Sequence, residues 1–173
     1  MKKKTIVLVI LIFCSISMIL VNHFRSEESK IIDTINTGNT DFSNDVSELV
    51  FTEEVEDGII CIATSKGGSM IVSYLKNEKL SDTKYQLMGR FTADPDKIIS
   101  DDPLSVKIMP IANFSEYSYY FGFCSDESAM KLSVDGNTIE PEKVSIEINE
   151  KIYTGYFWFF KSTDQPTVQV IDK

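Results

Sequence analysis

The chain has 173 residues, of which 26 are acidic and 17 are basic, and its formal net charge is -9 with histidine neutral. Four of the basic residues and none of the acids lie in the first 25 positions, so the other 148 residues hold 13 bases and 26 acids, a formal charge of -13. This charge repels nucleic-acid phosphates and therefore excludes nucleic acid from the expected partners, while 148 residues are enough for one folded domain.

The first element in the chain is an uninterrupted apolar run. No charged side chain lies between Lys4 and Arg25, and nearly every residue from Ile6 to Val21 is apolar. About 17 to 25 apolar residues cross a hydrocarbon core in a helix, and basic residues before a first span stay in the cytoplasm. We therefore predict a transmembrane signal anchor in residues 1–25 that contacts the membrane through residues 5–24. The chain would then be a single-pass protein of the cell membrane, with a cytoplasmic N-terminus and its C-terminal domain outside.

Two other fates of the N-terminus are open, a cleaved signal peptide and a lipoprotein signal. The spacing of Ser15 and Ser17 suits cleavage after Ser17, but the apolar run continues to Val21. Cys14 follows Phe13, whereas a lipoprotein signal needs a small residue before its cysteine. Both observations favour an uncleaved anchor.

A polar segment, residues 26–45, follows the apolar run. Its main apolar residues are Ile31, Ile32 and Ile35, whose spacing predicts a short helix that ends before Gly38. We interpret residues 26–45 as a polar tether and residues 46–173 as one extracytoplasmic domain.

From Val46 onward the pattern is that of an all-β domain, with short β-branched and aromatic runs separated by Gly, Pro, Asn and Asp. A hairpin is expected around Lys66-Gly67-Gly68, later turns at Asp135-Gly136 and Asn149-Glu150, and a strand end at Pro110. The predicted strands cover residues 59–64, 70–75, 85–92, 104–109, 117–124, 131–134, 144–148, 152–160 and 168–171. This number of strands predicts an antiparallel β-sandwich of immunoglobulin-like size or a small barrel.

The chemistry available to the domain is limited by its histidine content. The only histidine of the chain, His23, lies at the membrane boundary, so the domain cannot build a Ser-His-Asp, Cys-His or histidine–metal site. We expect no catalytic residue, no cofactor and no metal site. Pairs of carboxylates remain an alternative source of catalysis.

Two cysteines, Cys61 and Cys124, lie outside the apolar run. Outside the cytoplasm they could form a disulfide, which would close a loop of more than sixty residues. Both lie in strongly apolar segments, where thiols also occur as small buried hydrophobic groups. Either state fits the sequence.

Aromatic residues crowd the segment from Tyr153 to Phe160. In a strand, Tyr156, Trp158 and Phe160 share one face, which is a possible aromatic binding surface. The alternative is a central strand buried on both faces. A second aromatic group between Phe114 and Phe123 is expected to pack against the first.

The layout of the chain resembles small membrane-anchored proteins of Gram-positive bacilli that have no assigned activity. The resemblance rests on the lysine-rich anchor, the polar tether and four later segments: 57–61, 120–126, 132–136 and 155–160. It implies a bacterial cell-surface β domain that faces outward, and it implies no catalytic residue.

These features favour a membrane-anchored, noncatalytic β domain that binds a protein or cell-envelope partner. One alternative is a carboxylate-based or metal-dependent extracytoplasmic enzyme. Another is an accessory subunit of a membrane complex.

Overall fold

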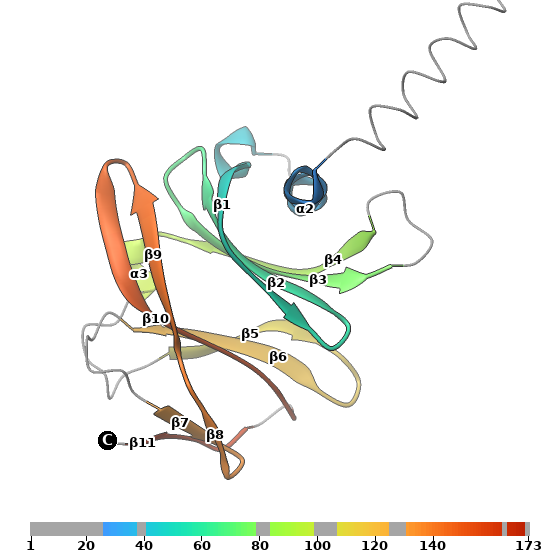
Figure 1. The fold of residues 1–173 in the computed structure, drawn as a ribbon, viewed down its shortest axis with the longest axis vertical. Helices are drawn as coiled ribbons and strands as arrows, with labels where there is room; N and C mark the ends of the chain where they lie inside the picture. Colours follow the sequence, from blue (N-terminus) through green and yellow to red (C-terminus); the bar gives the residue numbers. More distant parts are fainter. Residues whose placement is uncertain are drawn as a thin grey trace, which may run out of the picture.

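The computed structural model describes residues 26–37, 41–78, 84–98, 107–124, 131–163 and 166–171. The predicted anchor lies outside these residues, and none of the helices within them is long and apolar enough to cross a membrane. The described chain is mostly antiparallel β-structure, which confirms the all-β prediction (Figure 1).

The described elements are one ten-residue helix, two short helical turns and eleven strands. The helical elements are α2 (Glu27–Asn36), the 3₁₀ turn η1 (Phe42–Asn44) and α3 (Pro95–Ile98). The strands are β1 (Val46–Val55), β2 (Gly58–Ser65), β3 (Met70–Asn77), β4 (Tyr85–Ala93), β5 (Lys107–Asn113), β6 (Ser118–Cys124), β7 (Lys131–Val134), β8 (Asn137–Ile139), β9 (Glu142–Ile148), β10 (Lys151–Ser162) and β11 (Val168–Ile171).

The strands form three sheets, and every described pairing is antiparallel. The first sheet is the meander β1-β2-β3-β4, the second has the order β5-β6-β10-β9, and the third has the order β11-β7-β8. We call them sheets A, B and C. After β8 the chain returns to sheet B, where the hairpin β9–β10 pairs with β6 through β10.

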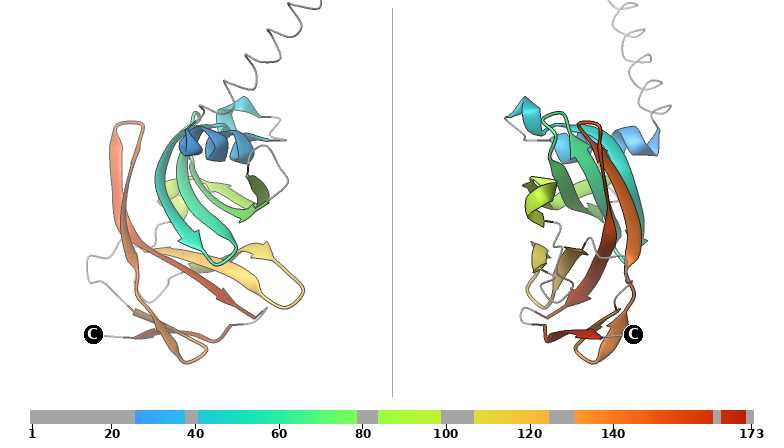
Figure 2. Two further views of the ribbon diagram at one scale, coloured as in Figure 1. Left: turned by 45° about the vertical axis from the view of Figure 1, so that its right-hand side comes forward. Right: turned by 90° about the vertical axis from the view of Figure 1, so that its left-hand side faces the viewer.

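Figures 1 and 2 show how the sheets and α2 are layered, and three hydrophobic clusters hold these layers together. The largest lies between sheets A and B and includes Ile62, Tyr74, Phe121 and Phe157. A second joins the other face of sheet A to α2, and a third joins the other face of sheet B to sheet C. The arrangement is sandwich-like, with α2 and sheet C as outer layers. Because β2, β3 and β6 are covered on both faces, every residue in these strands except the last two of β3 is buried.

The predicted turns are present. The hairpin β2–β3 turns at Gly68, whose φ of +81° favours glycine. Asp135 and Gly136 (φ +50° and +85°) join β7 to β8, and Asn149 and Glu150 (φ +51° and +64°) join β9 to β10. Successive positive φ angles are typical of the tight turns that match strand twist.

The prediction that Pro110 ends its strand is wrong, because β5 continues through it to Asn113. β5 is the terminal strand of sheet B, and the register with β6 shifts between Pro110 and Ala112. Proline lacks an N–H donor but is compatible with an edge strand or a bulge, where that donor is not needed.

The interpretation of residues 26–45 as a tether also needs correction. The predicted helix forms, but it is docked: Ile31 and Ile35 are 5% and 0% exposed and pack on sheet A. Arg90 of β4 donates hydrogen bonds to the carbonyls of Ile35, at 3.1 Å, and Asn44. The first bond satisfies an acceptor in the last turn of α2, and the second joins the end of η1 to β4. The folded unit therefore begins at α2.

Replacing Ile35 with alanine is expected to lower the free energy of unfolding by about 3 kcal/mol, the usual cost of removing a fully buried isoleucine side chain. If residues 26–45 were a free tether, this substitution would not change the free energy of unfolding. Chemical denaturation of the full-length protein in detergent measures the difference. Ile32→Ala is the control, because Ile32 is only partly buried and should cost less.

Candidate functional site

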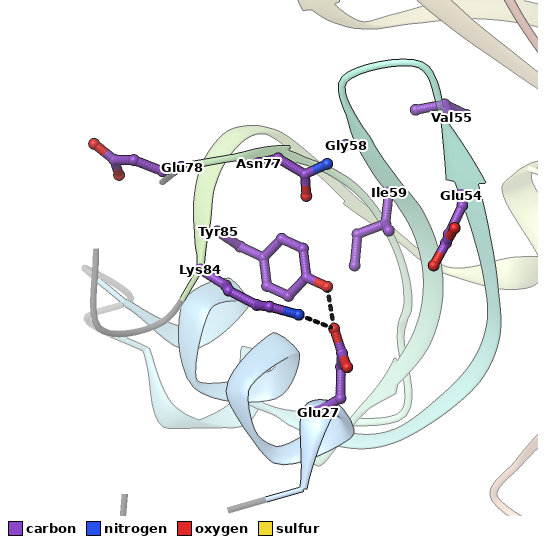
Figure 3. Close-up of a pocket in the computed structure, with 9 residues that line it drawn as sticks. All are labelled: Glu27, Glu54, Val55, Gly58, Ile59, Asn77, Glu78, Lys84 and Tyr85. Atoms are coloured by element: carbon purple, nitrogen blue, oxygen red, sulfur yellow. Dashed lines mark hydrogen bonds and ion pairs between the residues drawn. The ribbon is translucent and has the colours of Figure 1, made fainter. Parts of the chain in front are cut away.

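A cavity in the described chain lies between the first turn of α2 and one end of sheet A (Figure 3). Its volume is about 440 Å³, within the usual range for small-molecule sites. Its walls come from α2, β1, β2, the end of β3 and the start of β4, and its lining residues are Glu27, Glu54, Val55, Gly58, Ile59, Asn77, Glu78, Lys84 and Tyr85. We call it the Glu27 pocket.

Glu27 is held in place by two donors from the opposite wall. The phenol of Tyr85 donates to Glu27 Oε1 at 2.5 Å, and the Lys84 ammonium donates to the same oxygen at 3.1 Å. These two hydrogen bonds and the charge of Lys84 lower the pKa of Glu27. Glu27 also lies in the first turn of α2, whose N-cap is Ser26, and the helix dipole favours a carboxylate there. These contacts favour the charged form of the carboxylate.

Lys84 reaches Glu27 from an unusual backbone conformation. Its φ is +70°, a left-handed conformation that costs a non-glycine residue about 1 to 2 kcal/mol. Its carbonyl accepts a hydrogen bond from the Glu78 amide at 2.7 Å. This bond joins the residue that follows β3 to the residue that precedes β4. Strain of this kind is common at functional sites.

Tyr85 lies close to both Glu27 and Glu54. Burial raises the pKa of its phenol, and the Glu27 hydrogen bond and the negative charges of Glu27 and Glu54 raise it further. Tyr85 is therefore a neutral donor at physiological pH. Glu54 lies close enough for its charge to act on this ring, and Figure 3 shows it on the wall opposite α2.

The described lining of the pocket is acidic. Among the described lining residues, Glu27, Glu54 and Glu78 give three negative charges against one positive charge, that of Lys84. Among the described residues, no ion pair involves Glu54 or Glu78. Figure 3 shows Glu78 on the side of the pocket away from Glu54, with its carboxylate pointing outward. The pocket therefore offers separated negative charges around an aromatic ring.

This separation matters for the kind of cation that fits. Within the described ranges no three His, Cys, Asp or Glu side chains are grouped closely enough to hold a metal ion. Calcium and magnesium need several oxygens converging on one point. Carboxylates spread around a cavity suit an organic cation, whose carbon chain can lie against an aromatic ring.

A second polar cluster joins sheets A and B. Asp57, in the turn between β1 and β2, accepts hydrogen bonds from Tyr74 at 2.6 Å, Tyr119 at 2.7 Å and Tyr117 at 3.1 Å. Burial acts to raise the pKa of Asp57, but the three hydrogen bonds and the charge of Lys161 outweigh it and lower the pKa. We call this group the Asp57 cluster. Its carboxylate is already satisfied, which fits a structural role.

Cys61 and Cys124 are thiols in this structure. Cys61 lies in β2 and packs in the cluster beneath α2, whereas Cys124 lies in β6 and packs in the cluster beneath sheet C. Burial raises the pKa of the Cys61 thiol to about 12, so it is protonated and a poor nucleophile at neutral pH.

The possible aromatic binding surface is buried. Trp158 is 1% and Phe160 6% exposed, and Tyr156 is partly covered; all three pack between sheets B and C. Phe157 and Phe159 point to the opposite cluster, so β10 is buried on both faces. Sheet C, which covers the first face, is the reason that these residues form core packing instead of an exposed surface.

The two aromatic groups pack against each other as expected. β6 pairs directly with β10, and Tyr119 stacks on Phe159 at 5.2 Å between ring centroids. Tyr120 stacks on Phe160 at 5.5 Å on the other face. The aromatic side chains therefore stabilise sheet B itself.

Comparison with known proteins adds no family to this description: the chain matches no protein-family model, no curated protein and no solved structure.

Proposed function

We propose that this chain is a single-pass membrane protein whose noncatalytic, extracytoplasmic β-sandwich binds cationic organic ligands in the Glu27 pocket. The observation that carries the proposal is the pocket itself, a cavity of about 440 Å³ whose described wall includes three glutamates, one lysine and an aromatic ring. The strongly acidic composition of the domain supports it, since a negative field attracts cations to the pocket.

A binding role fits the state of the carboxylates better than a catalytic one. A general acid at neutral pH needs a raised pKa, but the pKa of Glu27 is lowered. A carboxylate that stays charged and is oriented by Tyr85 and Lys84 is suited to ion pairing.

The position of the pocket adds a second element to the proposal. Glu27 is two residues beyond Arg25, the end of the predicted anchor. If the anchor is retained, the pocket opens close to the outer membrane–water boundary. The ligand would then be a cation found at that boundary, in solution or on an envelope or protein partner.

The simplest probe is cadaverine, which has an amino group at each end of a five-carbon chain, and its uncharged analogue 1,5-pentanediol. Calorimetric titration of the full-length protein in nanodiscs is expected to show saturable binding of cadaverine and none of the diol. Glu54→Gln should weaken binding about threefold, the scale of one exposed ion pair.

The matched control is Glu147→Gln, because Glu147 is an exposed glutamate on β9, outside the pocket. This variant should bind cadaverine as the unmodified protein does. Equal weakening by the two substitutions would show that only the overall charge matters, and no binding of cadaverine would contradict the proposal.

A further inference from the structure

A second groove adjoins the Glu27 pocket. It has a volume of about 360 Å³ and is lined by Glu27, Glu28 and Ile31 of α2 and by Leu49, Val50, Phe51 and Thr52 of β1. Glu27 lines both cavities, so they are neighbours along β1.

The lining of this groove shows that it follows the edge of β1. Side chains of successive strand residues point to opposite faces of a sheet. Leu49 packs in the cluster beneath α2 and Phe51 in the cluster between sheets A and B, yet both line this groove, so it runs along the strand's edge.

Among the described strands the outer edge of β1 is unpaired, and β9 flanks part of it. β1 is the terminal strand of sheet A and pairs only with β2 among the described strands. The register shifts between Leu49 and Phe51, so Val50 has no partner residue on β2. β9 comes near β1 without pairing with it.

The charge of this edge indicates its partner. β1 carries Glu48, Glu53 and Glu54, all exposed, and no basic residue. Natural edge strands are often protected by lysines, which repel one another and discourage strand addition. An acidic edge instead favours the addition of a basic strand. Glu28 of α2, which lines the groove, contributes a further negative charge.

We propose that an extended segment of another protein, carrying a basic residue, adds to sheet A along β1 and places its basic side chain in the Glu27 pocket. This inference rests on the proposed function and names its ligand as a peptide. Val50 packs toward sheet B, whereas Glu54 lines the Glu27 pocket on the α2 side. The basic residue would therefore share the face of Glu54, and its two neighbours in the peptide would lie on the other face.

The probe is an acetylated, amidated peptide, Val-Thr-Val-Thr-Val-Lys-Val-Thr. Its control is the same peptide with N-methyl groups on alternate residues, which keeps the charge but blocks strand pairing. Titration of full-length protein in nanodiscs is expected to give at least tenfold weaker binding of the methylated peptide. Glu54→Gln should weaken the parent peptide about threefold and Glu147→Gln should not. Hydrogen exchange of β1 amides should slow only with the parent peptide.

The outcomes separate this inference from the proposed function. If the methylated peptide binds within twofold of the parent peptide, strand addition is wrong. If Glu54→Gln then weakens the binding of both peptides, the Glu27 pocket still binds cations. If cadaverine binds and neither peptide does, the peptide assignment is wrong. If no cation binds, both proposals are wrong. Without peptide, the hydrogen exchange of β1 amides could slow as the protein concentration rises. That result would show that a second copy of the chain occupies the edge, which also contradicts the inference.

Discussion

Replacing Asp57 with alanine is expected to lower the free energy of unfolding by about 4 kcal/mol. Asp57 is the acceptor for Tyr74 and Tyr119, whose side chains are 0% and 2% exposed, and for Tyr117. Each buried donor left without an acceptor costs about 1 to 3 kcal/mol. The cluster also joins sheet A to sheet B, so its loss should weaken the packing of the two sheets. Denaturant unfolding of the full-length protein in detergent measures the effect.

Single substitutions of the tyrosines serve as controls for this prediction. Tyr74→Phe removes one donor and leaves the others bonded, so a loss of about 1 kcal/mol is expected. A cost for Asp57→Ala no larger than that of Tyr74→Phe would contradict the account of the cluster.

The contribution of Asp57 should also depend on pH. Its folded-state pKa is lowered from an ordinary value of 3.8, so its stabilisation is present above pH 3.8 and is lost as the pH falls through the folded pKa. The stability difference between the unmodified protein and Asp57→Asn should therefore narrow in strong acid. A constant difference would indicate that the charge of Asp57 has no role.

Replacing Trp158 with alanine is the second change with a large expected effect, about 4 kcal/mol. The side chain is 1% exposed and packs between sheets B and C, against Leu132 and Val134 among others. Sheet C has three described strands, and Trp158 belongs to the cluster that packs it on sheet B. Hydrogen exchange should therefore show loss of protection first in residues 131–139 and 168–171.

Trp158→Phe provides the control. The indole Nε1 is buried and forms no hydrogen bond with the described part of the chain. Phenylalanine removes that donor and keeps most of the ring contact, so it should cost much less than alanine, about 1 kcal/mol. Equal costs would mean that the ring volume does not support sheet C.

The sequence predicts most of the central strands well, for a physical reason. β2, β3 and β6 are buried on both faces, so they appear as continuous β-branched and aromatic runs that turn residues bound. β1 was not predicted as a strand. Its glutamates and its two register shifts remove the simple alternation that marks a half-buried strand.

The docking of α2 was missed because a stripe of three isoleucines is compatible with both a free and a packed helix. What decides the outcome is the matching apolar face of sheet A and the Arg90 bonds to Ile35 and Asn44, which come from distant parts of the chain. An isolated helix of ten residues is marginal in water, so its packing supplies most of its stability.

The Glu27 pocket could not be predicted from the sequence. Its residues come from four separated segments: the start of α2, the β1–β2 hairpin, the end of β3 and the start of β4. The only local signal is the order Ser26-Glu27-Glu28, which marks a helix start with acids in the first turn. The possible aromatic binding surface on β10 is buried, and nothing in the sequence of β10 itself indicates that sheet C covers it.

A solved structure of the full-length protein with cadaverine would test cation binding in the Glu27 pocket most directly. One amino group is expected within about 3 to 4 Å of the Glu27 or Glu54 carboxylate, with the carbon chain against the Tyr85 ring. Cadaverine bound at another site, while this pocket holds none at a saturating concentration, would contradict this expectation.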